Sequence, residues 1–390
     1  MNTALSLEKA NPLRNEYPIL TRCTYLASHS LGAAPQRAKD QLIRYYNDWV
    51  EYGINAWEGP WIKQISLFSE LIEKVLGAPT NTVVPMENAT RALSAALSCF
   101  DFSSEKNEIL TTSLEFTTIY PLLQGLQKNG AKIKIVRAQT PITIDSQQVA
   151  KEITSKTAVV LTSHVYFRSG AIQEFEAIVE AARKNGASVI CDGYHAAGII
   201  PVDVQKMDVD FYVGGSHKWL CGGPGASFLY CKKDKISELN PAIRGWFALE
   251  DPFAYQNGLF EKEAGLRNSA MKFLGGTPSI CSLYAAQPGI ENILAYGVNK
   301  IRKTSLDFTQ EIISLSKELN LKVNTPSNPK QRGGMVCIDF EGAKQSVQFL
   351  EKRNIKVDFR PDCGIRVSPH FYSQIEEIHL FFSELRNFWL

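Results

Sequence analysis

The chain has 390 residues, 44% of them hydrophobic and 21% charged, which are ordinary values for a globular protein and allow a large buried core. The formal net charge of +2 provides no electrostatic basis for binding nucleic acid or an anionic membrane. The first twenty residues carry early charges, and no apolar run approaches the roughly 20 residues of a membrane span, so we expect neither a signal peptide nor an anchor.

Strand-like and helix-like segments alternate through the middle of the chain. Helical stretches such as 172–186, which ends in a glycine suited to a C-cap, lie between short runs rich in β-branched and aromatic residues. This alternation predicts an α/β fold, with a mostly parallel sheet covered by helices on both faces. The predicted strands are 131–138, 157–165, 187–192, 209–215 and 225–233.

The pattern changes towards the C-terminus. Residues 285–315 are predicted to form one long helix, and the short strands and helices that follow predict a smaller α+β unit. We place the domain boundary near residue 280, which divides the chain into a large domain at 21–280 and a small C-terminal α+β domain at 281–390. Residues 1–20 are expected to form an N-terminal arm that packs with the small domain.

The most informative segment of the sequence runs from residue 187 to residue 230. One predicted strand ends at Asp192, and Lys218 follows the next apolar run between pairs of glycines. Together with Ser163, these residues fall at the carboxyl ends of parallel strands, where functional groups are expected. A lysine in an apolar surround loses its proton readily and can form a Schiff base with an aldehyde, while an ionised aspartate keeps a pyridine nitrogen protonated. The segment therefore predicts an enzyme that uses pyridoxal 5'-phosphate (PLP).

Five motifs then resemble the class V aminotransferase superfamily of the type I PLP fold, and most closely its kynureninase-like branch. The resemblance covers nearly the whole chain in the family's order, and it implies a PLP-transferase fold with a seven-stranded-type, mostly parallel sheet in the large domain. The motifs are YLASHSLGAAP from Tyr25, SHVYFRSG from Ser163, RGWF from Arg244, RGGMVCIDF from Arg332 and GIRVSPHFYS from Gly364.

The resemblance implies roles for the residues around the cofactor ring. Lys218 carries PLP as the internal aldimine, Asp192 pairs with the pyridine nitrogen, and His195 holds the ring substituents. A helix N-cap at Asp192 and a structural histidine at His195 are the alternatives. Phe116 occupies the position of the ring that stacks on PLP, an interaction that contributes about 0.5–1.5 kcal/mol beyond area burial, although an isolated phenylalanine also suits a core. Ser163 is expected either to bond the phenolic oxygen or phosphate of PLP or to cap the next turn.

The phosphate is expected at the start of a helix, where backbone N–H groups are free to bind an anion. Ala89 and Thr90 open such a segment, and Thr90 is also a candidate N-cap. The resemblance implies further phosphate contacts from His217, Trp246 and Thr277. The family typically takes the last of these from the partner subunit, which implies a homodimer with shared active sites.

Arg366 is the candidate for binding the α-carboxylate of an amino acid substrate, since a guanidinium fork gives bidentate recognition. A structural ion pair is the alternative. After an external aldimine forms, the released Lys218 amine is expected to move the Cα proton. Amino transfer is the expected outcome and kynureninase-like hydrolytic or eliminative cleavage at Cβ the alternative. Kynureninases have a tyrosine at His217 and S-N at Gly276 and Thr277, and these differences favour amino transfer.

Two more distant alternatives are a cysteine desulfurase or C–S lyase and a non-catalytic protein of the PLP fold. Only two residues separate Cys363 from Arg366, which leaves no room for a loop with a nucleophilic thiol, so Cys363 is interpreted as a turn residue. The eight cysteines show no C-x-x-C pair and no Cys/His ligand spacing, so we expect no metal site and a cytoplasmic location. The substrate side chain is left open, with pocket candidates at Tyr52, Trp57, Trp61 and Arg168.

Overall fold

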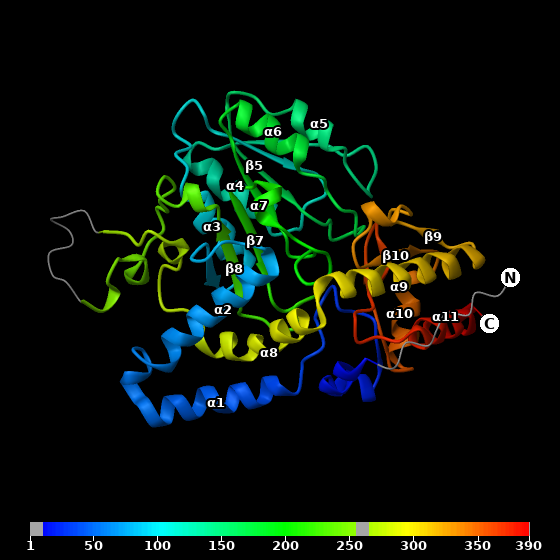
Figure 1. Ribbon diagram of the computed structural model, residues 1–390. Helices are drawn as coiled ribbons and strands as arrows, with labels where there is room; N and C mark the ends of the chain where they lie inside the picture. The colour runs from blue at the N-terminus through cyan, green and yellow to red at the C-terminus, as the bar shows by residue number, and fades with distance from the viewer. Residues whose placement is uncertain (1–10, 255–264, 390) are drawn as a thin grey trace.

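The computed structural model describes residues 11–254 and 265–389, and its centre is a seven-stranded sheet (Figure 1). The strands are β2 (Val83–Met86), β3 (Glu108–Thr112), β4 (Lys132–Val136), β5 (Thr157–Ser163), β6 (Ser188–Asp192), β7 (Phe211–Gly215) and β8 (Ser227–Cys231). In the order β2-β8-β7-β6-β5-β3-β4, only β8 runs antiparallel to its neighbours. The predicted α/β fold with a mostly parallel sheet is confirmed.

Every residue of β5, β7 and β8 is buried, because helices cover the sheet and leave no solvated face to these strands. The helix predicted at 172–186 is shorter in the structure, where it spans Glu176–Lys184 and is followed by Gly186 with a φ of +62°. The helices associated with this sheet are α1 (Arg37–Tyr52), α2 (Pro60–Leu76), α3 (Ala89–Leu97), α4 (Ile119–Leu126), α5 (Ser146–Lys151), α6 (Glu176–Lys184), α7 (Val204–Met207) and α8 (Ile280–Tyr296).

A second, smaller unit lies beside the sheet (Figure 1) and has its own apolar core. Its antiparallel sheet has the order β12-β13-β10-β9, and near it β1 pairs in parallel with β11. The elements are β1 (Thr24–Tyr25), α9 (Val298–Glu318), β9 (Lys322–Val323), β10 (Val336–Asp339), α10 (Ala343–Glu351), β11 (Ile355–Lys356), β12 (Asp358–Arg360), β13 (Gly364–Val367) and α11 (Ile375–Trp389).

The prediction of one long helix at 285–315 is wrong. Two helices, α8 and α9, meet at Gly297, whose φ of +89° lies in the left-handed region and breaks the helical path. The buried side chains of α8 belong to the core of the large sheet, whereas those of α9 that join a core belong mainly to the second core. The domain boundary near residue 280 stays a prediction.

The N-terminal segment packs against the C-terminal part of the chain. Arg14 forms an ion pair of 3.0 Å with Glu377 of α11, and the Tyr17 ring packs against Phe371 and Tyr372. Of the predicted arm at 1–20, residues 1–10 lie outside the described residues.

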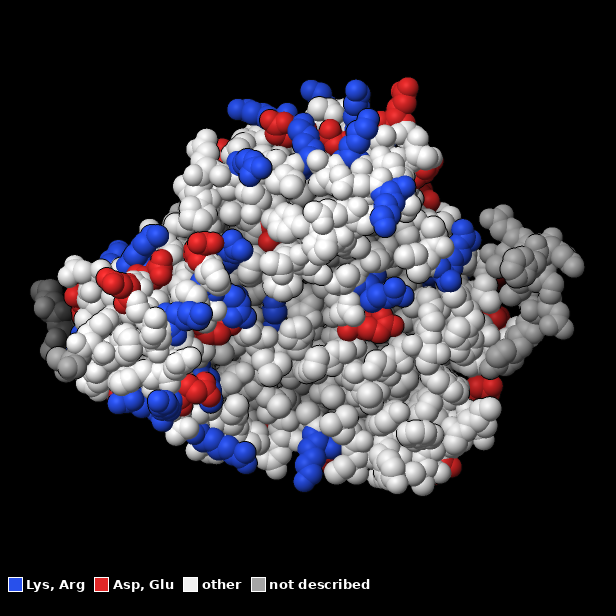
Figure 2. Space-filling model, turned by 180° about the vertical axis from the view of Figure 1, so that it is seen from behind, with Lys and Arg blue, Asp and Glu red and all other residues white. Residues whose placement is uncertain are grey.

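The surface and the helices set limits on the sites that the fold offers. Figure 2 shows basic and acidic side chains interspersed on the face opposite to Figure 1, with a broad area free of charged side chains at its centre. None of the helices in the described ranges is both long and apolar enough to cross a membrane. Within the same ranges, no three or more His, Cys, Asp or Glu side chains form a group that suits a metal ion.

Candidate active site

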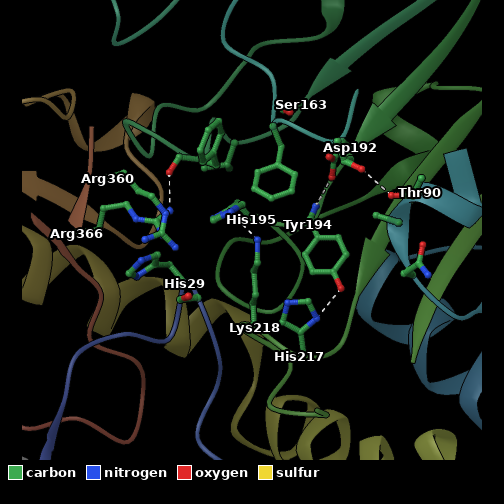
Figure 3. Close-up of a pocket in the computed structure, with 17 residues that line it drawn as sticks. His29, Thr90, Ser163, Asp192, Tyr194, His195, His217, Lys218, Arg360 and Arg366 are labelled. Carbon is green, nitrogen blue, oxygen red and sulfur yellow. Dashed lines mark hydrogen bonds between the residues drawn. The ribbon is translucent and has the colours of Figure 1, made fainter. Parts of the chain in front are cut away.

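A cavity of about 300 Å³ lies at the carboxyl ends of β5, β6 and β7, beside the hairpin of β12 and β13. Figure 3 shows that Arg360, Arg366 and His29 lie on one side of Lys218, and that Asp192, Tyr194 and Thr90 lie on the other. The fold brings together most of the predicted site residues here: Ala89, Thr90, Phe116, Ser163, Asp192, His195, His217, Lys218 and Arg366.

The Lys218 amine lies in the middle of the cavity. Its Nζ is 2.8 Å from Nε2 of His195, and burial lowers the pKa of the lysine to about 7 despite the opposing charge of Asp192. Burial also lowers the pKa of His195 well below its usual value, and the positive charge of Lys218 acts in the same direction. A substantial fraction of Lys218 is therefore a neutral amine near pH 7, which is the form that attacks an aldehyde.

Asp192 is the last residue of β6, and its carboxylate borders the same cavity. Its Oδ1 accepts a 3.0 Å hydrogen bond from the backbone N–H of Tyr194, which holds the carboxylate in place. Burial raises the pKa of Asp192, while this hydrogen bond and the charge of Lys218 oppose the rise. A protonated nitrogen heterocycle beside this carboxylate would compensate for its burial.

The first residues of α3 line one end of the cavity. The N-cap is Asn88, whose side chain accepts a 3.0 Å hydrogen bond from the N–H of Arg91, and not the predicted alternative Thr90. Thr90 Oγ1 lies 2.6 Å from Thr118 Oγ1, and Ala89, Thr90 and Thr118 all line the cavity. Helix N-termini carry positive partial charge, so these groups suit a phosphate.

Two aromatic rings flank the lysine amine. Nζ of Lys218 is 5.5 Å from the ring centroid of Phe116 and 4.7 Å from that of Tyr194. The Phe116 ring is held edge-on by Phe167 at 5.1 Å, and it remains 40% exposed. A ring that is held in place yet accessible from the cavity is available to stack on a planar ligand.

Ser163 borders the cavity, but its hydroxyl is bonded to a buried acid. It donates a 2.5 Å hydrogen bond to Glu115, which also accepts hydrogen bonds from Thr112 and Thr162. Burial raises the pKa of Glu115 to about 7, although the three hydroxyls oppose the rise. The expected bond from Ser163 to the cofactor stays a prediction, and it would have to compete with Glu115.

Arg366 lies on the other side of the cavity, opposite Asp358 in the register of β12 and β13. Its Nε and Nη2 donate to the two carboxylate oxygens of Asp358 at 2.8 and 2.5 Å, and its Nη1 donates to the backbone oxygen of Phe167 at 3.1 Å. A guanidinium has five N–H donors, so one hydrogen on Nη1 and one on Nη2 remain for a ligand. The predicted binding role and the alternative of a structural ion pair are therefore compatible.

Two more residues complete this substrate-side cluster, which consists of His29, Asp358, Arg360 and Arg366. Nε2 of His29 lies 2.9 Å from Oδ1 of Asp358, and Arg360 Nη2 is 3.1 Å from Oδ2. Burial alone would raise the pKa of Asp358, but the hydrogen bonds from His29 and Arg366 outweigh burial and hold that pKa well below its usual range. Burial and Arg366 lower the pKa of His29 to about 4, so His29 is neutral and the cluster carries one net positive charge.

Two predicted phosphate ligands lie elsewhere among the described residues. Trp246 packs on Phe247 at 4.3 Å between ring centroids, and Thr277 is exposed on the surface. Neither is among the residues that line the cavity of this chain, so their predicted roles stay predictions. The same holds for the four open candidates Tyr52, Trp57, Trp61 and Arg168.

Sequence reasoning missed several residues that line or support the cavity. Tyr194 was visible inside the segment from Asp192 to His195, and His29 lies within one of the quoted motifs. Asp358 and Glu115 carry no local signal, because their roles depend on partners that the fold supplies.

The donor set fits PLP. An amine with a lowered pKa, a buried carboxylate and a helix N-terminus surround one cavity, and these groups match the aldehyde, the pyridine nitrogen and the phosphate. The substrate-side cluster lies beyond the amine, where a second ligand would reach it (Figure 3).

Comparison with known proteins agrees with this geometry. The family described as Aminotransferase class-V matches residues 24–381. The chain is 29% identical to the kynureninase of Shouchella clausii (strain KSM-K16), over 96% of this chain and 91% of that protein. It is 27% identical to the uncharacterized aminotransferase YcbU of Bacillus subtilis (strain 168), over 94% of each.

A solved structure shows the same fold. The cystine C–S lyase C-DES, with glycine covalently linked to its PLP cofactor, has a TM-score of 0.87 and 22% identity, over 96% of this chain and 99% of that one. The resemblance to class V enzymes and to the kynureninase-like branch is confirmed, as is the predicted cofactor. This chain belongs to the class V aminotransferase family and is a PLP-dependent enzyme of the type I fold.

Proposed function

We propose that this enzyme binds an α-amino acid through Arg366 and transfers its amino group, with Lys218 as the acid and base at the substrate Cα. When bound, PLP supplies an aldehyde and an electron sink for the charge that develops at Cα. The observation that carries the proposal is the position of the Lys218 amine between the Asp192 side of the cavity and the guanidinium of Arg366 (Figure 3).

Each residue then has a defined task. Asp192, fixed by the Tyr194 N–H, pairs with a protonated ring nitrogen, and the first turn of α3 holds the phosphate together with His217. The two remaining N–H groups of Arg366 form a fork that orients one carboxylate. Since the cluster carries a single net positive charge, one substrate carboxylate neutralises it.

The absorbance spectrum of the purified enzyme, recorded with a panel of amino acids, tests this proposal. We expect a band of lysine-bound PLP that is absent from Lys218→Ala, and bleaching by an amino donor with a keto acid as the only carbon product. A protein that takes up no added PLP would contradict the cofactor assignment. Uptake of PLP without bleaching by any amino donor would contradict the proposed amino transfer but would leave the cofactor assignment intact.

Cleavage at Cβ is the second candidate, and the 29% identity to a kynureninase over most of both chains favours it. Both reactions begin with removal of a proton at Cα by Lys218. Only cleavage releases a second carbon fragment, so product analysis in the same experiment separates the two. A second fragment from any amino acid of the panel would replace our first proposal by this one.

A desulfurase mechanism lacks its nucleophile in this cavity. Among the described residues that line it there is no cysteine. Cys363 is fully buried, and its thiol donates a 2.8 Å hydrogen bond to the backbone oxygen of Arg168. A C–S lyase that needs no thiol nucleophile remains within the class of cleavage at Cβ.

We also propose that two copies associate and share their active sites. Helix α1 lies along the outer edge of the molecule (Figure 1) and exposes apolar side chains that are 45–67% accessible: Leu42, Ile43, Tyr46, Trp49 and Val50. Exposed apolar patches of this kind mark association surfaces. Light scattering should give a dimeric mass for the wild type and a monomeric mass for Trp49→Glu, and a monomeric wild type would contradict the proposal.

A reducing compartment such as the cytoplasm suits this chain, because all eight cysteines are free thiols in the structure.

A further inference from the structure

Tyr194 makes contacts that its position in the sequence, between Asp192 and His195, does not predict. Its phenol lies 2.7 Å from Nδ1 of His217, the residue before Lys218, and 3.3 Å from the hydroxyl of Ser227 (Figure 3). The end of β7 makes room for the phenol, since a Cβ on Gly215 would lie 2.0 Å from the Tyr194 oxygen. A phenol and an imidazole are thus placed together at the edge of the cavity.

His217 is neutral in this environment. Burial, together with the charge of Lys218, lowers its pKa to about 4. A neutral imidazole has one N–H, and the bond that one ring nitrogen makes decides which nitrogen carries the proton. Burial raises the pKa of Tyr194 to about 12, so its phenol keeps its proton and is able to donate.

The pair therefore has two possible arrangements of protons. When Tyr194 donates to Nδ1, Nε2 carries the proton of His217 and is a donor. When Nδ1 donates to the phenol oxygen, Nε2 is an acceptor and repels an anion. His217 lines the same cavity as Ala89 and Thr90. A phosphate that is bound in this cavity and contacts Nε2 favours the first arrangement, because only that arrangement offers it a donor.

We propose that Tyr194 is a positioning residue for the cofactor phosphate, which it serves by holding neutral His217 in the tautomer with a proton on Nε2. The inference rests on the phosphate role proposed for His217. It adds a hydrogen-bond relay from Ser227 through Tyr194 to His217, and it assigns a function to a side chain that lies between two cofactor ligands in the sequence.

Tyr194→Phe is the appropriate variant. It removes the phenol but keeps the ring, which lies 4.7 Å from the Lys218 amine and forms part of the cavity wall. Tyr212→Phe is the matched control, because the Tyr212 phenol also bonds a buried histidine, His164, at 3.0 Å, and neither residue lines the cavity.

The experiment compares the dissociation constants of PLP and of pyridoxal, which has the same ring and aldehyde but no phosphate, for the apoenzyme. We expect Tyr194→Phe to weaken PLP binding about five- to tenfold, the effect of one hydrogen bond, and to leave pyridoxal binding unchanged. Tyr212→Phe should change the ratio of the two constants by less than about twofold. Equal weakening of both ligands by Tyr194→Phe, or no weakening of either, would overturn the inference.

His217→Ala separates this inference from the function on which it rests. We expect His217→Ala to reduce the preference for PLP over pyridoxal, and Tyr194→Phe to cause no further loss in the His217→Ala background. If His217→Ala leaves the preference intact, the phosphate role of His217 fails. If His217→Ala reduces it and Tyr194→Phe does not, only the role of Tyr194 fails.

Nitrogen NMR of the histidines in the wild-type holoenzyme gives an independent reading that needs no variant of Tyr194. Assigned through the His217→Ala spectrum, the His217 ring should show a protonated Nε2 and an unprotonated Nδ1. A proton on Nδ1 would overturn the inference even if Tyr194→Phe failed to fold.

Discussion

The two sides of the cavity are built in different ways. The cofactor side uses residues close together in the sequence, Asp192 to His195 at the end of β6 and His217 with Lys218 after β7, on two strands that are neighbours in the sheet. The substrate side joins His29 to Asp358, which are 329 positions apart. The first side follows from a local rule of parallel sheets, whereas the second depends on how the N-terminal segment and the small unit pack.

Removal of the lysine should have the largest effect and should break the cofactor side alone. We expect Lys218→Ala to lower kcat by about 10²–10⁴-fold, the contribution of a positioned acid and base. Added small amines should restore part of the rate. Binding of a substrate carboxylate should persist, because Arg366 keeps its partner Asp358. A variant with more than a tenth of the wild-type rate would show that another group moves the proton.

Arg366→Lys tests the substrate side by keeping the charge and removing the fork. We expect KM for the amino donor to rise by about 10–100-fold, since charge-assisted bidentate bonds are lost. Steady-state kinetics with the donor found in the spectral panel measures this rise. The matched variant Arg360→Lys should have a smaller effect, because the side chain of Arg360 is 43% exposed. If Arg360→Lys raised KM more than Arg366→Lys did, Arg360 and not Arg366 would be the residue that binds the substrate carboxylate.

Asp358→Asn should show how strongly the substrate side contributes to stability. We expect a loss of about 3 kcal/mol in unfolding free energy at pH 7, as for removal of one partner from a mostly buried ion pair. The folded-state pKa of Asp358 is depressed, so its contribution is present above about pH 4, the unfolded value, and is lost as the pH falls below it. Denaturant titrations should therefore show the two proteins converging at acid pH.

The control for Asp358→Asn is Asp234→Asn, which removes a carboxylate that is 64% exposed and should change stability little. A difference between wild type and Asp358→Asn that stayed constant below pH 4 would contradict the ion-pair explanation.

The pH dependence of cofactor capture tests the buried amine. Because burial lowers the pKa of Lys218 to about 7, its reactive neutral form increases about tenfold between pH 6 and pH 8. The rate of covalent capture by the apoenzyme, followed by absorbance, should rise accordingly and level off above pH 8. Pyridoxal, which has no phosphate to titrate, should give the same profile. A rate that continued to rise towards pH 10 would show an ordinary exposed lysine.

The smallest effect is expected from Cys363→Ser. The hydroxyl can replace the thiol as donor to the Arg168 backbone oxygen, so kcat and KM should stay within about twofold of the wild type. Assays with cysteine as donor, with sulfide as a second readout, check this. Loss of sulfide release in Cys363→Ser alone would restore the desulfurase alternative.

The sequence predicted the sheet well and the helical connections less well. All five predicted strands were found, and three of them, β5, β6 and β7, are mostly buried parallel strands, which appear as continuous apolar runs. The prediction left out β2 and β3. The break between α8 and α9 was missed because the apolar pattern continues through Gly297. The two helices that meet there contribute mainly to different cores, which the pattern does not reveal.

For the site, it was easier to predict which residues line the cavity than which contacts they make with one another. The structure brings Lys218, Asp192 and Arg366 together in one cavity, while their roles stay predictions. The bond of Ser163 to Glu115 was not foreseen, and the ion pair of Arg366 was given as an alternative without its partner Asp358. Trp246 and Thr277 have no place in the cavity of a single chain.

The amino-acid sequence by itself determined the cofactor chemistry, because the residues proposed to hold PLP follow strands of one sheet and parallel strands end at a common edge. Only the tertiary structure decided the contacts on the substrate side and the pairing of Tyr194 with His217. Those features depend on the pairing of groups far apart in the chain, on the volume left by Gly215, and on burial, which is the largest cause that moves the pKa values of Lys218 and His217 towards their neutral forms.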